Sequence, residues 1–402
     1  MRLWRSSDGR GYAGRVRRLA LSSLAAMLLL APPAAAAPDC AGGPFPARKL
    51  ATGQGTLESV IVHPNGRLYF TNASGLLRLD SPDGTPVVHT QAAEPGGLAL
   101  IPFGAIIMGV GNSIANGTAG DQTGPSGLIR INPKTGASRP YATGLSMGNG
   151  VDRGPDGSFY ASNDFGSNID RIRNGQTERG WAKVESGNGL HVDSTGKWLY
   201  VAQTFRPAAI QRVEIANPQN VTPFAVAPPE DVNAGFDGMD RDAADNLYVA
   251  ANGAGSIWKI TPDAKMCVLM RNLPPFPDGP SAVAVGEHGT PFPPENLYVV
   301  AFNGDLIEIA GVVDPGRPPK LRLQIVPPAT VARERTRFRA TVTANDYPVA
   351  GAVVRLAGEE ATTGPRGRAK LTRTFKRPGK RRASATRDGF RRTRTAIRVA
   401  VP

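Results

Sequence analysis

The sequence is poor in the residues and patterns on which helical bundles depend. Aromatic residues make up only 6% of its 402 residues, and no apolar repeat of helical period is long enough to predict a major helix. Glycine and proline are abundant instead, with 47 and 36 residues. This composition excludes a helical bundle and favours many short strands joined by turns.

Long apolar runs are also missing, apart from residues 19–31 near the N-terminus. This stretch follows six arginines and precedes an alanine-rich segment. It is too short to span a bilayer, and its flanks are typical of an export signal. We expect cleavage after Ala36, which makes residues 1–36 a signal peptide and leaves no transmembrane segment in a secreted or envelope-associated chain. An uncleaved anchor is the alternative.

Cysteine and histidine are scarce. Only Cys40 and Cys267 are present, and in an exported chain such a pair predicts a disulfide, with two free thiols as the alternative. The four scattered histidines are interpreted as packing or surface residues; they are His63, His89, His191 and His288. The sequence also lacks the spacing of a nucleophile elbow, and the glycine-rich run at residues 109–112 precedes no predicted helix, which argues against dinucleotide binding.

Acidic and basic residues are divided unevenly along the chain, whose net charge is +14. Residues 317–402 contain 22 Lys/Arg and five Asp/Glu, whereas residues 37–316 contain 19 and 27. Residues 314–320 form a proline-rich, stiff segment between these parts and are predicted to be a linker. The division predicts an acidic body and a basic tail module with different tasks.

A pattern that recurs six times organises the acidic body. Each copy starts with a polar or small residue, has a Gly or Asp turn position eight residues later, and continues into a strand. Successive copies start 38 to 53 residues apart, which is the spacing of four-stranded propeller blades. The sequence therefore predicts an all-β, six-bladed propeller over residues 37–313. The starting residues are Glu58, Gly96, Asn149, Asn188, Asp237 and Ser281.

Rotation about the propeller axis should gather these starting residues in a ring at the mouth of a central channel. Glu58, Asn149, Asn188 and Asp237 would form an all-oxygen site of charge −2. Such donors favour Ca²⁺, with Zn²⁺, Mn²⁺ or Mg²⁺ as alternatives. The small residues that follow them should let the strands approach the axis closely. The alternative is that the Asn-Gly and Asp-Gly pairs only form turns, although Glu58 is not a turn residue.

An insertion at residues 112–127, within the second repeat, is predicted to be a mobile loop over the ring. Beyond the linker, alternating apolar and polar segments predict a small immunoglobulin-type sandwich over residues 321–402. Segments 349–353, 362–364 and 385–390 resemble bacterial immunoglobulin-like and carboxypeptidase-regulatory-like modules.

The arginines of this module lack an aromatic stacking platform, so we expect no binding to nucleic acid. They are interpreted as a solvated basic surface or as a site for an anionic polymer or lipid headgroups of the cell envelope.

Residues 58–310 resemble the senescence-marker-protein/gluconolactonase (regucalcin-like) family of six-bladed propellers. The resemblance rests on Glu58 ahead of the Pro-Asn-Gly-Arg-Leu-Tyr-Phe segment, and on Asn149-Gly150, Asn188-Gly189-Leu190 and Asp237-Gly238-Met239. In that family a glutamate, an asparagine and an aspartate hold one divalent cation. These positions match Glu58, Asn188 and Asp237, and the substrate-facing asparagine matches Asn149.

Two departures bear on what the resemblance implies. Glu58 stands between leucine and serine instead of in a Gly-Glu-Gly-Pro setting, and Met147 replaces an arginine of the sugar-lactone hydrolases. The resemblance therefore implies a metal-dependent hydrolase of a lactone or related ester, with Asp237 as the general base, rather than a sugar-lactone enzyme. The alternatives are a non-catalytic cell-surface binding propeller with a structural ion and a strictosidine-synthase-like condensing propeller. We expect a monomer that acts on a small molecule.

Overall fold

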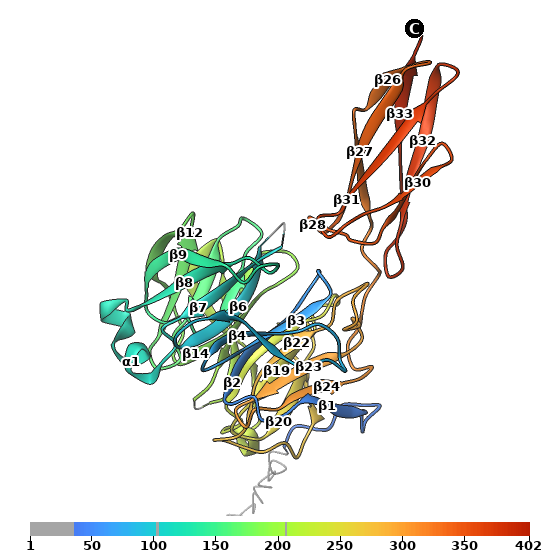
Figure 1. Cartoon of the computed structure of the whole chain (residues 1–402). Helices are drawn as coiled ribbons and strands as arrows, with labels where there is room; N and C mark the ends of the chain where they lie inside the picture. The colour runs from blue at the N-terminus through green and yellow to red at the C-terminus, as the bar shows by residue number, and fades with distance from the viewer. Residues whose placement is uncertain (1–35, 102–103, 206) are drawn as a thin grey trace, which may run out of the picture. The chain divides into compact units, whose positions relative to one another are not determined.

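The computed structural model describes residues 36–101, 104–205 and 207–402. The predicted signal peptide, except for its last residue, lies outside the described residues. Strands dominate the described part of the chain, which contains one α-helix and one short 3-10 segment, η1 (Pro229–Asp231) (Figure 1). The predicted all-β class is confirmed.

The first five predicted repeats each form one four-stranded antiparallel sheet, and the sixth repeat supplies three strands of a further four-stranded sheet. The first two sheets contain β2 (Leu57–His63), β3 (Arg67–Asn72), β4 (Gly75–Leu79) and β5 (Val87–Gln91), then β6 (Pro95–Ile101), β7 (Ala105–Val110), β8 (Ser126–Ile131) and β9 (Ser138–Leu145). The third and fourth contain β10 (Val151–Arg153), β11 (Phe159–Ser162), β12 (Asn168–Arg173) and β13 (Gln176–Lys183), then β14 (Gly187–Val192), β15 (Trp198–Gln203), β16 (Ala209–Glu214) and β17 (Asn217–Val226). The last two contain β18 (Phe236–Arg241), β19 (Leu247–Ala251), β20 (Ser256–Ile260) and β21 (Met266–Met270), then β22 (Pro280–Val285), β23 (Leu297–Ala301), β24 (Leu306–Ile309) and β1 (Ala47–Ala51).

The six sheets close into a circle. The first strand of each sheet contacts the first strand of the next, and β2 contacts both β6 and β22. In the sixth sheet the outermost strand is β1, which pairs with β24 so that Ala47 lies opposite Ile309. One sheet therefore joins the beginning and the end of the propeller. Large side chains at equivalent positions of the second strands fill the space between sheets; they include Tyr69, Tyr160, Tyr248 and Tyr298.

The insertion at residues 112–127 was predicted to be a mobile loop. This prediction is wrong, because the insertion contains α1 (Ile114–Thr123). Ser113 caps its start by accepting a hydrogen bond from the backbone N–H of Asn116, and Gly124 ends it with a φ of 62°. The helix carries no apolar stripe, so hydrophobic periodicity could not reveal it. Close packing holds it instead, because a Cβ at Gly120 would lie 1.9 Å from the carbonyl oxygen of Ser146.

A helix, α1, does follow the glycine-rich run at residues 109–112, although none was predicted there. The strands that flank it, β7 and β8, are antiparallel neighbours. A dinucleotide-binding unit needs parallel strands on either side of such a helix. The argument against dinucleotide binding therefore rests on the antiparallel pairing of β7 and β8, and no longer on the lack of a helix.

The basic tail module contains two sheets that share one apolar core. The first has β27 (Arg335–Ala344) at its centre and includes β25 (Arg322–Val326), β28 (Tyr347–Pro348) and β31 (Arg368–Thr374). The second contains β26 (Ala329–Val331), β33 (Thr393–Ala400), β32 (Gly379–Thr386), β29 (Val353–Leu356) and β30 (Glu359–Thr362). The core includes Phe338, Val354, Leu371 and Ile397. The immunoglobulin-like assignment of this module remains a prediction.

A disulfide joins Cys40 to Cys267 of β21. The backbone beside it pairs as well, since Cys40 N–H donates to the carbonyl of Val268 over 2.9 Å. An ion pair between Arg271 and Asp39, at 2.6 Å, adds to this attachment. The segment after the predicted signal peptide is therefore fixed along the fifth sheet. Within the described ranges, no helix has both the length and the apolar character needed to cross a bilayer.

Candidate metal centre

The first strands of the sheets are irregular where the predicted repeats begin. Regular pairing is broken within residues 57–60 of β2, 187–190 of β14 and 236–239 of β18. A β-bulge of this kind turns side chains out of the normal alternation. The side chains released in this way line one cavity in the channel; they are Glu58, Asn188 and Asp237.

Glycine follows three of the four ring residues because the neighbouring backbone lies against it. A Cβ added at Gly150 would lie 2.2 Å from the carbonyl oxygen of Asn188. A Cβ added at Gly189 would lie 2.5 Å from the carbonyl oxygen of Asp237. At Gly238 it would lie 2.6 Å from the Cβ of Ala282. The expected close approach of the strands is confirmed, and it is what brings the ring residues near each other.

The structure brings the four predicted polar residues to the same cavity. The side chains of Asn149, Asn188 and Asp237 are buried, and Glu58 is partly exposed to the channel. The remaining starting positions add no ligand, because Gly96 has no side chain and the Ser281 hydroxyl donates to the carbonyl of Leu57 over 2.7 Å. The roles of the four residues remain predictions.

Two further polar residues reach the ring and were missed by the sequence analysis. Asn112, two residues after β7, donates from Nδ2 to Oε1 of Glu58 over 2.9 Å. Asp164, two residues after β11, is 8% exposed and is hydrogen-bonded by the side chain of Asn149. Both residues follow the second strand of a sheet, whereas the repeat pattern marks the first strand. The only available signal was their shared position, two residues after the end of a second strand.

Helix α1 positions the segment that carries Asp164. The carboxylate of Asp121 accepts hydrogen bonds from the backbone N–H of Ser167 and from Nδ2 of Asn163, both over 2.9 Å. Nδ2 of Asn163 also donates to the carbonyl of Gly117 over 2.8 Å. Burial alone would raise the pKa of Asp121, but these hydrogen bonds outweigh it and lower that pKa.

Three carboxylates, Glu58, Asp164 and Asp237, lie close enough to affect one another, and burial makes each of them reluctant to ionise. It raises the pKa of Glu58 to about 7 and the pKa of Asp164 to about 6. Burial also raises the pKa of Asp237 well above its ordinary value, and the nearby charges of Glu58 and Asp164 raise it further. Within the described part of the chain, none of the three forms an ion pair with a basic side chain.

A divalent cation fits these residues on two grounds. Oδ1 of Asp164 and Oδ1 of Asn112 are buried and have no hydrogen-bond partner in the described chain, although buried polar atoms normally have one. The donors are all oxygen atoms, as hard cations prefer. Among the described residues, no three histidine, cysteine or carboxylate side chains converge as a preformed ligand set. A cation here would therefore depend on the Asn188 amide and on water as well as on carboxylates.

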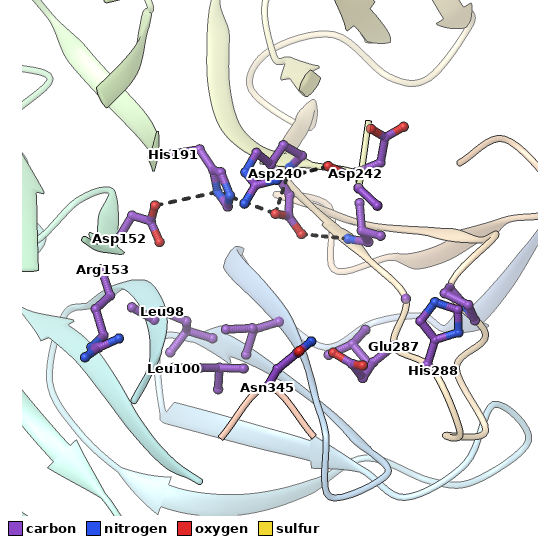
Figure 2. A pocket seen from close by; sticks show the side chains of 18 of the residues that line it. Leu98, Leu100, Asp152, Arg153, His191, Asp240, Asp242, Glu287, His288 and Asn345 are labelled. Atoms are coloured by element: carbon purple, nitrogen blue, oxygen red, sulfur yellow. Dashed lines mark hydrogen bonds and ion pairs between the residues drawn. The ribbon is translucent and has the colours of Figure 1, made fainter. Parts of the chain in front are cut away.

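A second polar group lines the cavity three residues further along the same strands (Figure 2). Nδ1 of His191 lies 3.5 Å from Oδ1 of Asp240 and 3.8 Å from Oδ2 of Asp152. Backbone N–H groups hold both carboxylates, from Val192 to Asp152 over 2.7 Å and from Val285 to Asp240 over 2.8 Å. The sequence analysis interpreted His191 as a packing or surface residue, and the structure adds that its ring lines the channel between two carboxylates.

The charge state of this second group follows from its burial. Burial lowers the pKa of His191 to about 4 and raises the pKa of Asp152 to about 6. At neutral pH the imidazole is therefore uncharged and Asp152 is ionised. Leu98 and Leu100 line the cavity as well (Figure 2), so this part of the channel has polar and apolar walls.

Comparison with known families agrees with this geometry. Residues 58–290, more than half of the chain, match the SMP-30/gluconolactonase/LRE-like region. The chain therefore belongs to this family, and the matched part contains all four predicted ring residues. No curated protein matches the sequence.

Solved structures with the same fold include two bacterial proteins. The calcium-binding protein regucalcin from Agrobacterium tumefaciens is 18% identical, with a TM-score of 0.52, and the match covers 68% of this chain and 96% of that one. A gluconolactonase from Xanthomonas campestris is 15% identical, with a TM-score of 0.52 and coverage of 69% and 98%. At these identities the likeness establishes the propeller fold alone.

Proposed function

We propose that the protein is a divalent-cation-dependent hydrolase of a lactone or related ester. The observation that carries this proposal is the group of carboxylates formed by the partly exposed Glu58 and the buried Asp164 and Asp237, which lacks a basic partner in the described chain. Uncompensated buried charge is costly, and a cation would offset that cost. Two proteins with the same fold are named as a calcium-binding regucalcin and a gluconolactonase. The first name supports the proposed cation, and the second supports the proposed lactone substrate.

In this proposal Glu58, Asn188 and Asp237 hold the cation, with Ca²⁺ as the first choice and Zn²⁺, Mn²⁺ or Mg²⁺ as alternatives. Nδ2 of Asn188 donates to Oγ1 of Thr204 over 3.1 Å, which leaves the amide oxygen available as a ligand. Thr204 in turn donates to the carbonyl of Phe236 over 2.8 Å. The hydrogen bond from Thr204 to Phe236 links the fourth sheet to the residue directly before Asp237.

A cation bound there would polarise the substrate carbonyl and lower the pKa of a water molecule. Asn149 orients the substrate oxygen, and Asp237 accepts the proton of the attacking water as general base. The water oxygen bonds to the carbonyl carbon, the ester C–O bond breaks, and Asp237 returns the proton to the leaving alkoxide. Burial suits Asp237 to this task because it raises the pKa of the group and so makes its carboxylate a stronger base.

Met147 bears on the class of substrate. Its side chain is 2% exposed and packs under α1, where its sulfur would lie 2.8 Å from a Cβ at Gly117. This position therefore supplies no donor for sugar hydroxyls. Because Leu98 and Leu100 line the cavity, we expect lactones or esters with few hydroxyl groups to be better substrates than aldonolactones.

The test is hydrolysis of a panel of lactones and esters by the purified protein, with added Ca²⁺, Zn²⁺ or Mn²⁺ and with a chelator. Turnover that depends on the cation supports the proposal, and no turnover with any cation contradicts it. The rival function, a binding propeller with a structural ion, predicts cation-dependent thermal stability without hydrolysis of any compound in the panel.

We also propose that the chain is exported and acts as a monomer, either secreted or associated with the cell envelope. The disulfide between Cys40 and Cys267 supports this location, because disulfides persist mainly in oxidising compartments. Cell fractionation and N-terminal sequencing test the proposal. A mature N-terminus at Ala37 is expected, whereas an intact chain in the cytoplasm would contradict it.

A further inference from the structure

The outward face of β27 carries three successive arginines. Arg335, Arg337 and Arg339 are exposed, and the alternate residues Phe338 and Ala340 are buried in the core. Strand geometry spaces such alternate residues about 6.8 Å apart. The arginines therefore form a straight row of positive charge along the central strand of this sheet.

Strand β31 widens this row. Lys370 lies directly opposite Arg339, and Arg368 lies opposite Thr341; both basic side chains are exposed. We call the five residues of the two strands the basic row; they are Arg335, Arg337, Arg339, Arg368 and Lys370.

The basic row has no partner of opposite charge within the described chain. None of its side chains forms a hydrogen bond or an ion pair there. Three other arginines of the module are paired: Arg322 with Asp346, Arg355 with Glu360, and Arg373 with Glu359. Like charges directly opposite each other destabilise a sheet, so the Arg339–Lys370 pair costs stability that an anionic ligand would restore.

Two features of the basic row define its ligand. Four of the five residues are arginines, whose planar guanidinium groups bind phosphate through paired hydrogen bonds. The outward positions of β25, β27 and β31 contain no aromatic side chain. Proteins that bind single-stranded nucleic acid use such side chains to stack the bases. The face therefore suits a phosphate polymer without bases.

We propose that the basic row binds a linear, base-free phosphate polymer of the cell envelope, which would lie along β27. The proposal relies on the proposed export for access to this polymer, but not on the chemistry of the channel. A protein without hydrolase activity would bind the polymer equally well, so the two proposals can fail separately.

The second sheet of the module offers a matched control. Lys380 and Arg382 of β32, and Arg394 and Arg398 of β33, are exposed on its outward face. In β33 the small residue Ala396 separates the two arginines. No strand of this face has charges at three successive outward positions in the described chain. Three positive charges can therefore be removed from this face, as many as in the test variant, without interrupting a continuous row.

The experiment measures binding of inorganic polyphosphate to the purified chain as a function of salt concentration. The test variant combines Arg335→Gln, Arg337→Gln and Arg339→Gln. The logarithm of the binding constant falls linearly with the logarithm of the salt concentration, and each phosphate contact on a single strand contributes about 0.7 to the slope. Removal of three contacts should therefore reduce the slope by about 2. Affinity in 0.1 M salt should fall on the order of 100-fold. The control variant, with Lys380→Gln, Arg394→Gln and Arg398→Gln, should lose only a few-fold because screening weakens distant charges.

Several outcomes would overturn the proposal. Equal losses in both triple variants would mean that net charge alone sets the affinity. Tighter binding of an oligothymidylate of equal charge would identify a nucleic-acid surface, and binding of anionic phospholipid vesicles without polyphosphate would identify a membrane surface. Far-UV circular dichroism checks that both variants fold. If the triple variant does not, Arg337→Gln alone should reduce the slope by about 0.7, and an unchanged slope would contradict the proposal.

Discussion

Asp237 combines two roles in the proposed chemistry, because it belongs to the ring and also accepts the proton. Asp237→Asn keeps the shape of the side chain but removes the base. We expect kcat to fall by about 10²–10⁴-fold, while the melting temperature of the cation-free protein stays nearly unchanged. Steady-state kinetics and thermal unfolding measure the two quantities.

Asp164→Asn is the matched control for this substitution, since Asp164 is a carboxylate close to Asp237 that lies outside the predicted ligand set. It should reduce kcat less than Asp237→Asn does. The structural rival predicts a different result, in which Asp237→Asn mainly diminishes the stabilisation by the cation and no turnover exists to be lost.

The raised pKa values of the ring predict how pH and cations act together. A carboxyl group whose pKa is raised by folding stabilises the protein at low pH, and this stabilisation is lost as pH rises through about 6 for Asp164 and about 7 for Glu58. A bound cation replaces the proton and removes this loss. The increase in melting temperature caused by Ca²⁺ should therefore be small near pH 5 and largest near pH 8.

Thermal unfolding with Ca²⁺ and with a chelator, across this pH range, measures the effect. Glu58→Gln should flatten the dependence because it removes one of the titrating groups. An equal Ca²⁺-induced increase at both ends of the range would show that the cation does not bind these carboxylates.

At the scale of elements, the ring depends on the close contact between neighbouring first strands. A methyl group at Gly189 would lie 2.5 Å from the carbonyl oxygen of Asp237, so Gly189→Ala must push β14 and β18 apart. We expect a loss of about 1–3 kcal/mol in the free energy of unfolding and weaker cation binding. Denaturant titration and calorimetry measure these changes.

Gly364→Ala is a suitable control, because an added Cβ meets no atom within 4 Å there and the backbone is not left-handed. It should leave stability nearly unchanged. If both variants are equally stable, contact between the first strands is not what holds the ring together.

The sequence allowed the strands and the ring to be predicted to different extents. The turn and strand positions recur, and each repeat therefore locates Glu58, Asn149, Asn188 and Asp237 by the same offset. Asp164 and His191 do not follow this offset, and their roles depend on neighbours from other sheets. Helix α1 was missed for another reason, since its stability comes from caps and backbone contacts rather than from an apolar stripe.

At the scale of the whole molecule, the disulfide attaches the segment before β1 to the fifth sheet. Cys40→Ser should release this segment and lower the free energy of unfolding by about 2–4 kcal/mol. Thermal unfolding of the wild type with and without dithiothreitol should show the same difference. The variant Cys40→Ser/Cys267→Ser should not respond to the reductant, and a wild type that is equally stable after confirmed reduction would contradict the prediction.

The pairing of β1 with β24 has a consequence for the order in which the molecule assembles. Residues 47–51 are synthesised before the other strands of the propeller, yet their partner strand, Leu306–Ile309, is made after the other five sheets. Such distant pairings form slowly. Until synthesis has passed Ile309, the nascent circle stays open, and two strand edges must be kept from pairing with other chains.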